Sequence, residues 1–448
     1  MDANLIPQFG GLLWTIVAFV AALSIIVAIH EYGHYIVGRW CGIKADVFSI
    51  GFGPILFSRE DRHGTRWQFA ALPLGGYVKF RGDANAASVG ADDTTLSMSE
   101  AERRQTMTGA PLWRRAATVI AGPAFNFILS IAIFGAFAVF AGRAVEAPVV
   151  GEIVVLPPGV ETLAPGDEVL DVAGRPVAGL LELTEVAAAL PDAETVAYRI
   201  RRDGAILDVD AAFPMPARAE SVMPDSAAWD VGMRPGDVVT AVDGEPIHSF
   251  GALRERVADG EGRPVGVDVW RPTEGGGGET FVLTLTPRAL DLPLPQGGFE
   301  RRWLIGINGG LFFEPATEAA GPLEALGYGV RQTVDIISTS LSALGHIVVG
   351  QISTCNLSGP VGIAQTAGAV ATLGPEQFIW FIAVLSAAVG MLNLFPIPVL
   401  DGGHLVFHAY EAMRGRPPSD GAVRVLMTMG VALMGALMVF ALWNDFTC

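Results

Sequence analysis

The segment His30-Glu-Tyr-Gly-His34 lies near the end of an apolar stretch that runs from Gly11 to about Val37. A helix of this length can cross a bilayer, which needs about 20 residues. Residues four apart on a helix point to nearly the same side, so both imidazoles would face one metal ion, with Glu31 beside them. Ionisable side chains are costly inside a membrane, which favours a functional site over two interfacial histidines at the end of a span.

Four stretches of the chain are long and apolar enough to cross a membrane. Besides residues 11–37, they are about 116–141, 378–400 and 423–443. Of the 448 residues, 51% are hydrophobic and 17% charged, and the apolar ones are concentrated in these blocks. The first stretch is too long for a cleaved signal peptide, and no Lys or Arg precedes Arg39. The sequence therefore predicts a multi-pass α-helical membrane protein with four spans.

The charges between the predicted spans are unevenly distributed. Residues 38–115 contain 11 Lys and Arg against 8 Asp and Glu, whereas residues 143–331 contain 15 against 30. A second basic group, Arg414, Arg416 and Arg424, lies between the last two spans. Basic loops stay on the cytoplasmic side, so both termini and the acidic region are expected outside. The acidic charge argues against nucleic acid as a partner.

The acidic outer region contains an internal repeat. Residues 163–177 align with residues 233–247, with 7 identities in 15 positions, and each copy begins with a Pro-Gly-Asp turn. An apolar strand and a second turn follow in both copies. The repeat predicts two inserted β-rich modules, at about 147–214 and 217–288.

The basic segment between the first two spans is predicted to contain β structure over residues 46–81. Asp46–Phe57 and Trp67–Ala71 read as strands on either side of a turn, and Leu72–Phe80 adds glycines beside a short apolar strand. Asp83–Thr95 is small and polar and is expected to be mobile.

Residues 325–375, on the outer side, are expected to associate with the membrane surface. Their first part places apolar side chains on one helical face. These side chains are Val330, Val334, Ile337, Leu341, Leu344 and Val348. His346 lies in the same stretch and is interpreted as an interfacial residue, not a metal ligand.

The three cysteines do not indicate a metal site. Cys41, Cys355 and Cys448 are far apart and form no Cys-x-x-Cys pair, so they support neither a disulfide framework nor a thiolate zinc site. A metal ion must therefore be bound by His and carboxylate.

Asp401 is the best candidate for a third metal ligand, because catalytic zinc takes three protein ligands and keeps one position open. Pro396 and Pro398 break the helix just before it, at the inner end of the third predicted span. Two alternatives stay open. Asp401 could be only a polar residue that ends the span, and His404 with His408, also four apart, could form a rival metal pair.

The two motifs together resemble the site-2 protease family. That family combines H-E-x-x-H in its first span with a late N-x-x-P-x-P-x-L-D-G segment, which here runs from Asn393 to Gly402. The tandem insertion after the second span resembles the PDZ domains of its bacterial sigma-E regulator branch. By this resemblance His30, His34 and Asp401 bind one zinc ion, Glu31 is the catalytic base, and the modules are PDZ-like.

The resemblance also implies a substrate-binding region. Gly75, Gly76, Tyr77 and Val78 match a membrane-associated β-hairpin that pairs with an unwound substrate, and Asn393 matches a position that helps to hold substrate near zinc. The alternative for the hairpin is an ordinary one at the membrane surface. Two further segments, 121–126 and 357–363, resemble the family's G-P-x-x-N signature and the segment before its third span.

The function implied is intramembrane cleavage of transmembrane segments by a zinc endopeptidase in the bacterial inner membrane. Expected substrates are single-span membrane proteins of the anti-sigma factor type, after their outer domain is trimmed, with signal-peptide remnants as a further candidate. The outer modules would exclude bulky substrates or bind peptides. The competing interpretation is a membrane-anchored PDZ adaptor with a non-catalytic metal site, and a metal transporter would need more intramembrane ligands.

Overall fold

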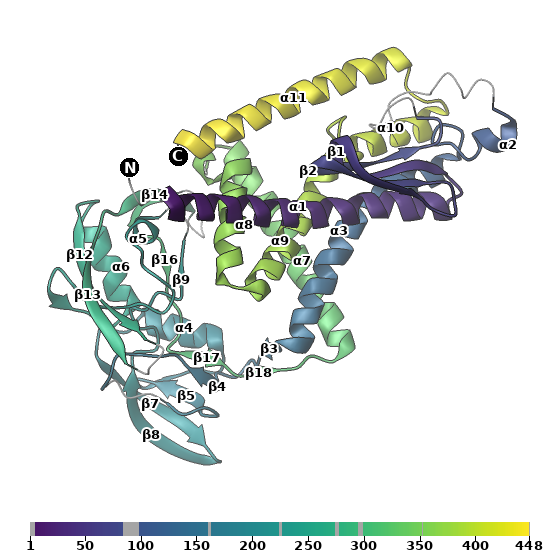
Figure 1. The fold of residues 1–448 in the computed structure, drawn as a ribbon. Coiled ribbons are helices and arrows are strands. Elements are labelled where there is room, and N and C mark those ends of the chain that lie inside the picture. Colours follow the sequence, from purple (N-terminus) through teal and green to yellow (C-terminus); the bar gives the residue numbers. More distant parts are fainter. Residues whose placement is uncertain are drawn as a thin grey trace. The chain divides into compact units, whose positions relative to one another are not determined.

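The computed structural model describes residues 5–83, 98–159, 163–223, 226–273, 277–293, 299–351 and 353–447. The segment Asp83–Thr95 lies outside these ranges except for its first residue. The chain divides into two compact units (Figure 1). The helical unit comprises Met1–Ala136, Pro322–Val348 and Thr354–Cys448, and the β unit comprises Phe137–Gly321 and Val349–Ser353.

Four helices are long and apolar enough to cross a membrane, which confirms the predicted spans. The spanning stretches are Gly11–Trp40 of α1 (Leu5–Trp40), α3 (Leu112–Phe140), α9 (Pro375–Asn393) and Gly421–Thr447 of α11 (Asp420–Thr447). The shorter helices of the helical unit are α2 (Glu100–Arg103), α7 (Pro322–Val348), α8 (Pro360–Leu373) and α10 (Asp401–Arg414).

The third spanning helix ends earlier than the apolar pattern suggests. The pattern continues to Leu400, but α9 ends at Asn393 and a turn separates it from α10. Pro396 and Pro398 lie in this turn, and a proline inside a helix removes a backbone hydrogen bond and clashes with the preceding turn. Asp401 is therefore the first residue of a new helix.

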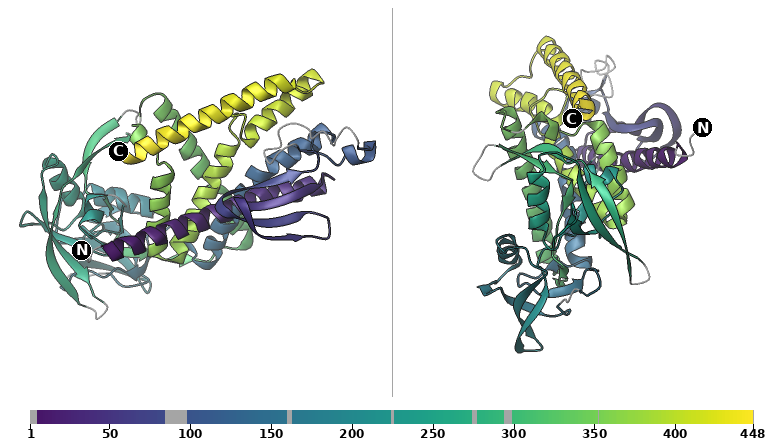
Figure 2. Two further views of the ribbon diagram at one scale, coloured as in Figure 1. Left: turned by 45° about the horizontal axis from the view of Figure 1, so that its top comes forward. Right: turned by 90° about the vertical axis from the view of Figure 1, so that its left-hand side faces the viewer.

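Small residues let the spans approach closely. A side chain at Gly33 of α1 would collide with the carbonyl of Ala121 on α3, and one at Gly390 of α9 would press on α3 at the carbonyl of Pro123. Close backbone approach through glycine is the usual way in which helices pack inside a membrane. Helices α1, α3 and α9 therefore pack closely against one another in the helical unit. Figure 2 gives two further views of the fold.

Helix α7 packs through a face of small residues. Ala325, Gly329 and Thr333 are buried, and Gly329 lies against the backbone of Ile131 on α3. The predicted apolar face points elsewhere, since Val334 on that face is 54% exposed. An exposed apolar face agrees with contact to lipid, and its membrane association stays a prediction.

An antiparallel sheet of two long strands, β1 (Ala45–Glu60) and β2 (Arg66–Phe80), packs against the C-terminal half of α1 (Figure 1). Residues 45–50 pair with residues 76–80, and they also pair with residues 66–69. No other described strand pairs with residues 76–80, so they form an edge of the sheet. The β structure expected over 46–81 is present.

The β unit contains two sheets of the same design, each with four antiparallel strands and one helix. Their strand orders are β6-β5-β7-β8 and β11-β10-β12-β13. The first sheet consists of β5 (Glu168–Val172), β6 (Arg175–Pro176), β7 (Thr195–Arg202) and β8 (Ala205–Ala212), with α4 (Leu180–Ala188). The second consists of β10 (Val238–Val242), β11 (Glu245–Pro246), β12 (Val265–Pro272) and β13 (Gly278–Leu285), with α6 (Phe250–Asp259).

Chain beyond residue 288 completes the cores of both sheets. Phe312 and Phe313 lie in the core of the first sheet, and Ile305 lies in the core of the second. The smaller elements of the β unit are β3 (Arg143–Ala144), β4 (Val150–Ile153), β9 (Ser221–Val222), α5 (Ala227–Asp230), β14 (Arg288–Pro293), β15 (Phe299–Leu304), β16 (Ile307–Asn308), β17 (Phe313–Pro315) and β18 (Thr317–Glu318). The predicted ranges 147–214 and 217–288 thus contain the two sheets but not their whole cores, and the likeness to PDZ domains stays a prediction.

The inference drawn from the cysteines was wrong in one respect. Cys355 is disulfide-bonded, whereas Cys41 is free. Wide spacing along the chain says little about pairing, because a disulfide depends on how closely two Cα atoms approach in the folded structure.

Candidate metal centre

The two histidines of the H-E-x-x-H segment lie on one side of α1, as their spacing predicts. Their ring centroids are 4.8 Å apart and the ring planes meet at 86°, so the rings stand edge to face. Nε2 of His30 and Nε2 of His34 are 3.2 Å apart. Both side chains are largely buried, with 11% and 12% of their surface exposed.

Asp401 reaches the histidines from the first turn of α10. The chain doubles back tightly before this helix, and glycine is required on its inner side. A side chain at Gly402 would collide with the carbonyls of Leu394 and Phe395, and one at Gly403 with the carbonyl of Ile397. The two glycines of the Leu-Asp-Gly-Gly segment therefore allow the tight turn that directs the Asp401 carboxylate toward α1.

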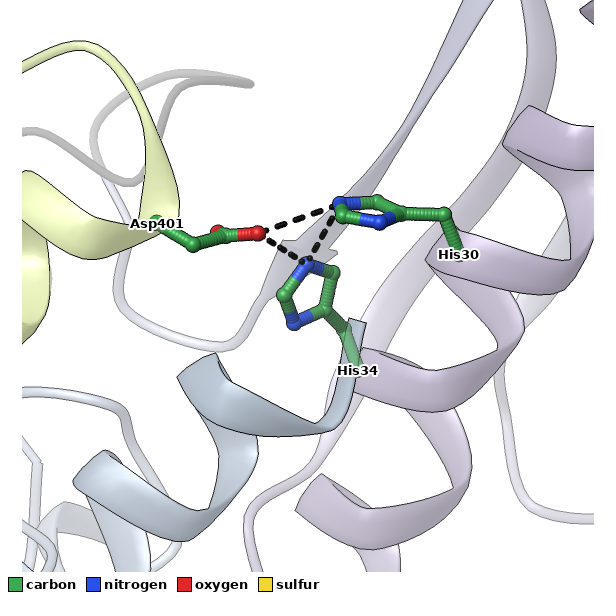
Figure 3. A group of neighbouring side chains, drawn as sticks. All are labelled: His30, His34 and Asp401. Atoms are coloured by element: carbon green, nitrogen blue, oxygen red, sulfur yellow. Dashed lines mark hydrogen bonds and ion pairs between the residues drawn. The ribbon is translucent and has the colours of Figure 1, made fainter. Parts of the chain in front are cut away.

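Three ligand atoms converge at the centre of this site (Figure 3). Asp401 Oδ2 lies 3.1 Å from Nε2 of His30 and 3.4 Å from Nε2 of His34. Zinc binds such atoms tetrahedrally at about 2.0–2.1 Å, which separates neighbouring ligand atoms by about 3.3–3.4 Å. Asp401 Oδ2 is also buried, and no donor among the described residues reaches it with suitable hydrogen-bond geometry. The triangle thus fits one zinc ion, with a fourth position left open.

Helix α3 contacts the far nitrogen of each imidazole. Nδ1 of His34 lies 2.8 Å from the carbonyl oxygen of Thr118, and Nδ1 of His30 lies 3.3 Å from the side-chain amide of Asn126. Between them, a side chain at Gly122 would collide with both rings. Residues at positions 118, 122 and 126 share one face of the helix, so α3 supports the two rings together.

Glu31 is held next to the edge of the β1/β2 sheet. Its side chain lies beside the backbone of the edge strand at Gly76. The strand passes so closely that a side chain at Gly76 would lie 3.2 Å from Cγ of Glu31 and 2.8 Å from the carbonyl of Ser49. The structure therefore brings the predicted catalytic base and the predicted substrate-binding strand together.

Other candidate residues lie in different places. The hydroxyl of Tyr77 accepts a hydrogen bond from Gln68 at 3.1 Å, so this side chain is fixed within the sheet. Gly75 precedes the edge segment on β2. Asn393 is the last residue of α9, and its side chain makes no hydrogen bond within the described chain.

The rival pair His404 and His408 acquires no third ligand among the described residues, where the only cluster suited to a metal is His30, His34 and Asp401. Burial and the nearby Arg115 guanidinium lower the pKa of His408 to about 4. Arg115 itself is paired with Glu411 at 2.6 Å. His408 is thus a neutral ring near the ion pair between α3 and α10.

Sequence reasoning missed the supporting role of α3. The segment 121–126 was noticed only as part of a resemblance, without a function for Gly122 or Asn126. A usable signal was present, because Thr118, Gly122 and Asn126 are spaced by four in an otherwise apolar span.

Comparison with known proteins agrees with this geometry. The model of peptidase family M50 matches residues 18–437. A protein of Agrobacterium fabrum named as a zinc metalloprotease is 38% identical over 434 residues, covering 96% of this chain and 95% of the relative. A similarly named protein of Rhizobium meliloti is 38% identical over 436 residues, covering 96% of each chain.

A third relative carries a more specific name. The regulator of sigma-E protease RseP of Salmonella typhimurium is 32% identical over 467 aligned positions, which cover 97% of this chain and 99% of the relative. The family match and these full-length similarities show that the chain belongs to peptidase family M50 and is a membrane-embedded zinc metalloprotease of the site-2 protease type.

Proposed function

We propose that His30, His34 and Asp401 bind a single catalytic zinc ion and that Glu31 is the general base for peptide hydrolysis. The observation that carries this proposal is the triangle of three ligand atoms, whose sides match a tetrahedral zinc site. Zinc in such a site activates water and polarises the peptide carbonyl.

Glu31 is suited to moving the proton. It is adjacent in sequence to one ligand, and its side chain lies beside the edge strand at Gly76. It takes a proton from the attacking water and passes it to the amine that leaves. A membrane-anchored adaptor with a structural metal would have no need of this carboxylate.

The edge segment 76–80 supports a way to present the substrate. A transmembrane helix hides its peptide carbonyls in internal hydrogen bonds, so it must unwind before it can be cut. Strand addition to a free sheet edge replaces those bonds with bonds to the enzyme. Gly76, Tyr77 and Val78 lie on such an edge next to Glu31, and Gly75 precedes them. Asn393, at the end of α9, is proposed to help hold the extended segment.

The proposed substrates are transmembrane segments of single-span membrane proteins, of the anti-sigma factor type, whose outer domains have been trimmed. Remnants of signal peptides are a further candidate class. Support comes from the four candidate spans of the chain and from the relative named as a regulator of sigma-E protease. We further propose the bacterial inner membrane as the location.

Two observations support the proposed orientation, with both termini and the β unit outside. Lys and Arg outnumber Asp and Glu in the segments 38–115 and 414–424, which supports a cytoplasmic location for those segments. Cys41, within the first basic segment, is free, whereas Cys355 is disulfide-bonded. Disulfides persist in oxidising compartments such as the periplasm. The β unit is proposed to act there as a size filter, with peptide binding as the alternative.

The decisive experiment measures zinc and cleavage on the same preparation of full-length protein in detergent. Zinc content is expected near one ion per chain and should be lost, together with cleavage of a single-span model substrate, on chelation. His404→Ala is the control and should keep both properties. If the wild-type protein binds zinc but cleaves neither unwound nor helical substrates, the adaptor interpretation is favoured. Loss of zinc in His404→Ala would contradict the proposed ligand set.

A further inference from the structure

The outer nitrogens of the two zinc-site histidines meet different groups on α3. Nδ1 of His34 faces a backbone carbonyl, that of Thr118, at 2.8 Å. A carbonyl can only accept, so Nδ1 of this ring carries the proton and Nε2 keeps a free lone pair. Metal-binding histidines are commonly fixed in this way by a carbonyl or carboxylate behind the ring.

His30 faces an amide, which can either donate or accept. The side chain of Asn126 is completely buried and lies 3.3 Å from Nδ1 of His30. Oxygen and nitrogen of an amide are assigned from their hydrogen bonds. The other end of this amide, placed as Oδ1, has no hydrogen-bond partner within the described chain, so no further contact opposes turning the group.

The geometry around His30 decides between the two orientations. Its Nε2 faces Asp401 Oδ2 at 3.1 Å and Nε2 of His34 at 3.2 Å, so this is the nitrogen that points to the metal position. A ligand nitrogen must have its lone pair free. The proton of a neutral His30 is therefore on Nδ1, and the group that meets Nδ1 must accept it.

Asn126 is itself held firmly in place. Its backbone carbonyl accepts hydrogen bonds from Ser130 at 3.1 Å and from Ser386 of α9 at 3.0 Å. The same hydroxyl lies 2.7 Å from the carbonyl oxygen of Ala383, so its single proton is shared between the two carbonyls. Both serines are fully buried, so α9 fixes α3 at the level of His30.

Resting on the proposed ligand set, we propose that Asn126 is a positioning residue whose side-chain carbonyl accepts the Nδ1 proton of His30. Together with the carbonyl of Thr118 at His34, it fixes both imidazoles in the tautomer that presents Nε2 to zinc. Gly122 leaves the space in which the two rings lie between these acceptors.

The test is the rate at which full-length protein in detergent releases zinc to an excess of chelator. Asn126→Leu has nearly the same shape and cannot accept, so release should be roughly 10–100-fold faster than in the wild type. Asn126→Asp keeps an acceptor and should release zinc no faster than the wild type. If the amide acted as a donor or only filled space, Asn126→Asp would release zinc as fast as Asn126→Leu, which would overturn the proposal.

Asn444→Leu is the matched control. Asn444 is a buried asparagine of α11 whose amide donates to the carbonyls of Thr354 and Leu357. This variant should lower thermal stability and leave zinc release unchanged. If Asn126→Asp does not fold, the comparison of the two leucine variants decides: equal release rates would overturn the proposal. If the purified wild-type protein contained no zinc, that result would instead contradict the proposed ligand set.

Discussion

Aspartates with little exposed surface have different roles in the two units of this protein. In the β unit, Asp167 accepts two hydrogen bonds from Arg202, at 2.6 and 2.7 Å, and one from the N–H of Ala164. In the helical unit, Asp401 faces two imidazole nitrogens, and its Oδ2 has no donor of suitable geometry in the part of the chain that the structure describes. Burial alone therefore does not identify a functional carboxylate. A carboxylate oxygen that lacks a hydrogen bond and lies beside other possible metal ligands does.

The Pro-Gly-Asp repeat extends this comparison. Asp237, the equivalent of Asp167 in the second copy, is paired with Arg271 at 2.7 Å and accepts from the N–H of Arg234 at 2.8 Å. Both carboxylates close a turn and tie it to a neighbouring strand. The repeat thus conserves a structural device between the two sheets, and its aspartates are not candidates for metal or substrate binding.

The largest expected effect is that of Asp401→Ala. Two imidazoles alone bind zinc weakly, so the variant should lose both its zinc and detectable cleavage of a single-span substrate. Metal analysis and a cleavage assay on one preparation measure the two losses. Asp237→Ala is the control and should keep zinc and cleavage of a trimmed substrate. Full zinc occupancy in Asp401→Ala would show that Asp401, like Asp237, is not a metal ligand.

Glu31→Gln should separate chemistry from metal binding. The change keeps the size of the side chain and leaves the three ligands in place, so zinc should stay bound. Cleavage should fall by about 10²–10⁴-fold, the usual contribution of a general base. Cleavage at the wild-type rate would remove Glu31 from the mechanism, and loss of zinc would make it a structural residue of the site.

Gly122→Ala tests the space beside the imidazoles. A methyl group there would push against His34 and His30, whose rings are backed by α3. Zinc affinity should fall roughly 10–100-fold, as for other disturbances just behind a ligand. Gly435→Ala is the matched control and should leave zinc affinity unchanged, because no described atom lies within 4 Å of the new methyl on α11. Equal affinities in both variants would show that the rings can move aside.

Removal of the β unit should change selectivity and spare the chemistry. The structure indicates residues 147–315 as the segment to replace by a short linker. A shorter deletion would remove the sheets but keep Phe312 and Ile305, whose side chains pack in the cores of those sheets. The remaining ends stay together, since Val145 N–H donates to the carbonyl of Ala316 at 3.0 Å. Zinc and cleavage of a trimmed substrate should persist, and a substrate with its bulky outer domain should now be cut. Unchanged discrimination would favour peptide binding over a size filter.

The smallest effect on activity is expected from Asp167→Asn, which should act on stability alone. Although burial opposes ionisation, hydrogen bonds from Arg202 and from the N–H of Ala164 keep the pKa of Asp167 below its usual range. A lowered pKa contributes stability above about pH 4, the value of the unfolded chain, and this contribution is lost as the pH falls further. Asp167→Asn should cost about 1–3 kcal/mol at neutral pH and less in acid. Thermal unfolding at several pH values measures this, and an equal cost at every pH would contradict it.

Much of this protein could be predicted from local patterns. The four spans follow from the length of apolar stretches against the thickness of a bilayer, and the facing of His30 and His34 follows from helical periodicity. The two similar sheets follow from the repeat. These properties depend on residues close together in sequence, so they do not require knowledge of the packing.

The partners of the ligands were decided only by the tertiary structure. Asp401 was one candidate beside His404 and His408, and its place at the zinc site depends on a turn folded back against Gly402 and Gly403. The acceptor role of Thr118, the contact of Asn126 with His30 and the disulfide of Cys355 were likewise absent from the prediction. Each joins groups from distant parts of the chain, and such contacts depend on how whole helices pack, which no local periodicity encodes.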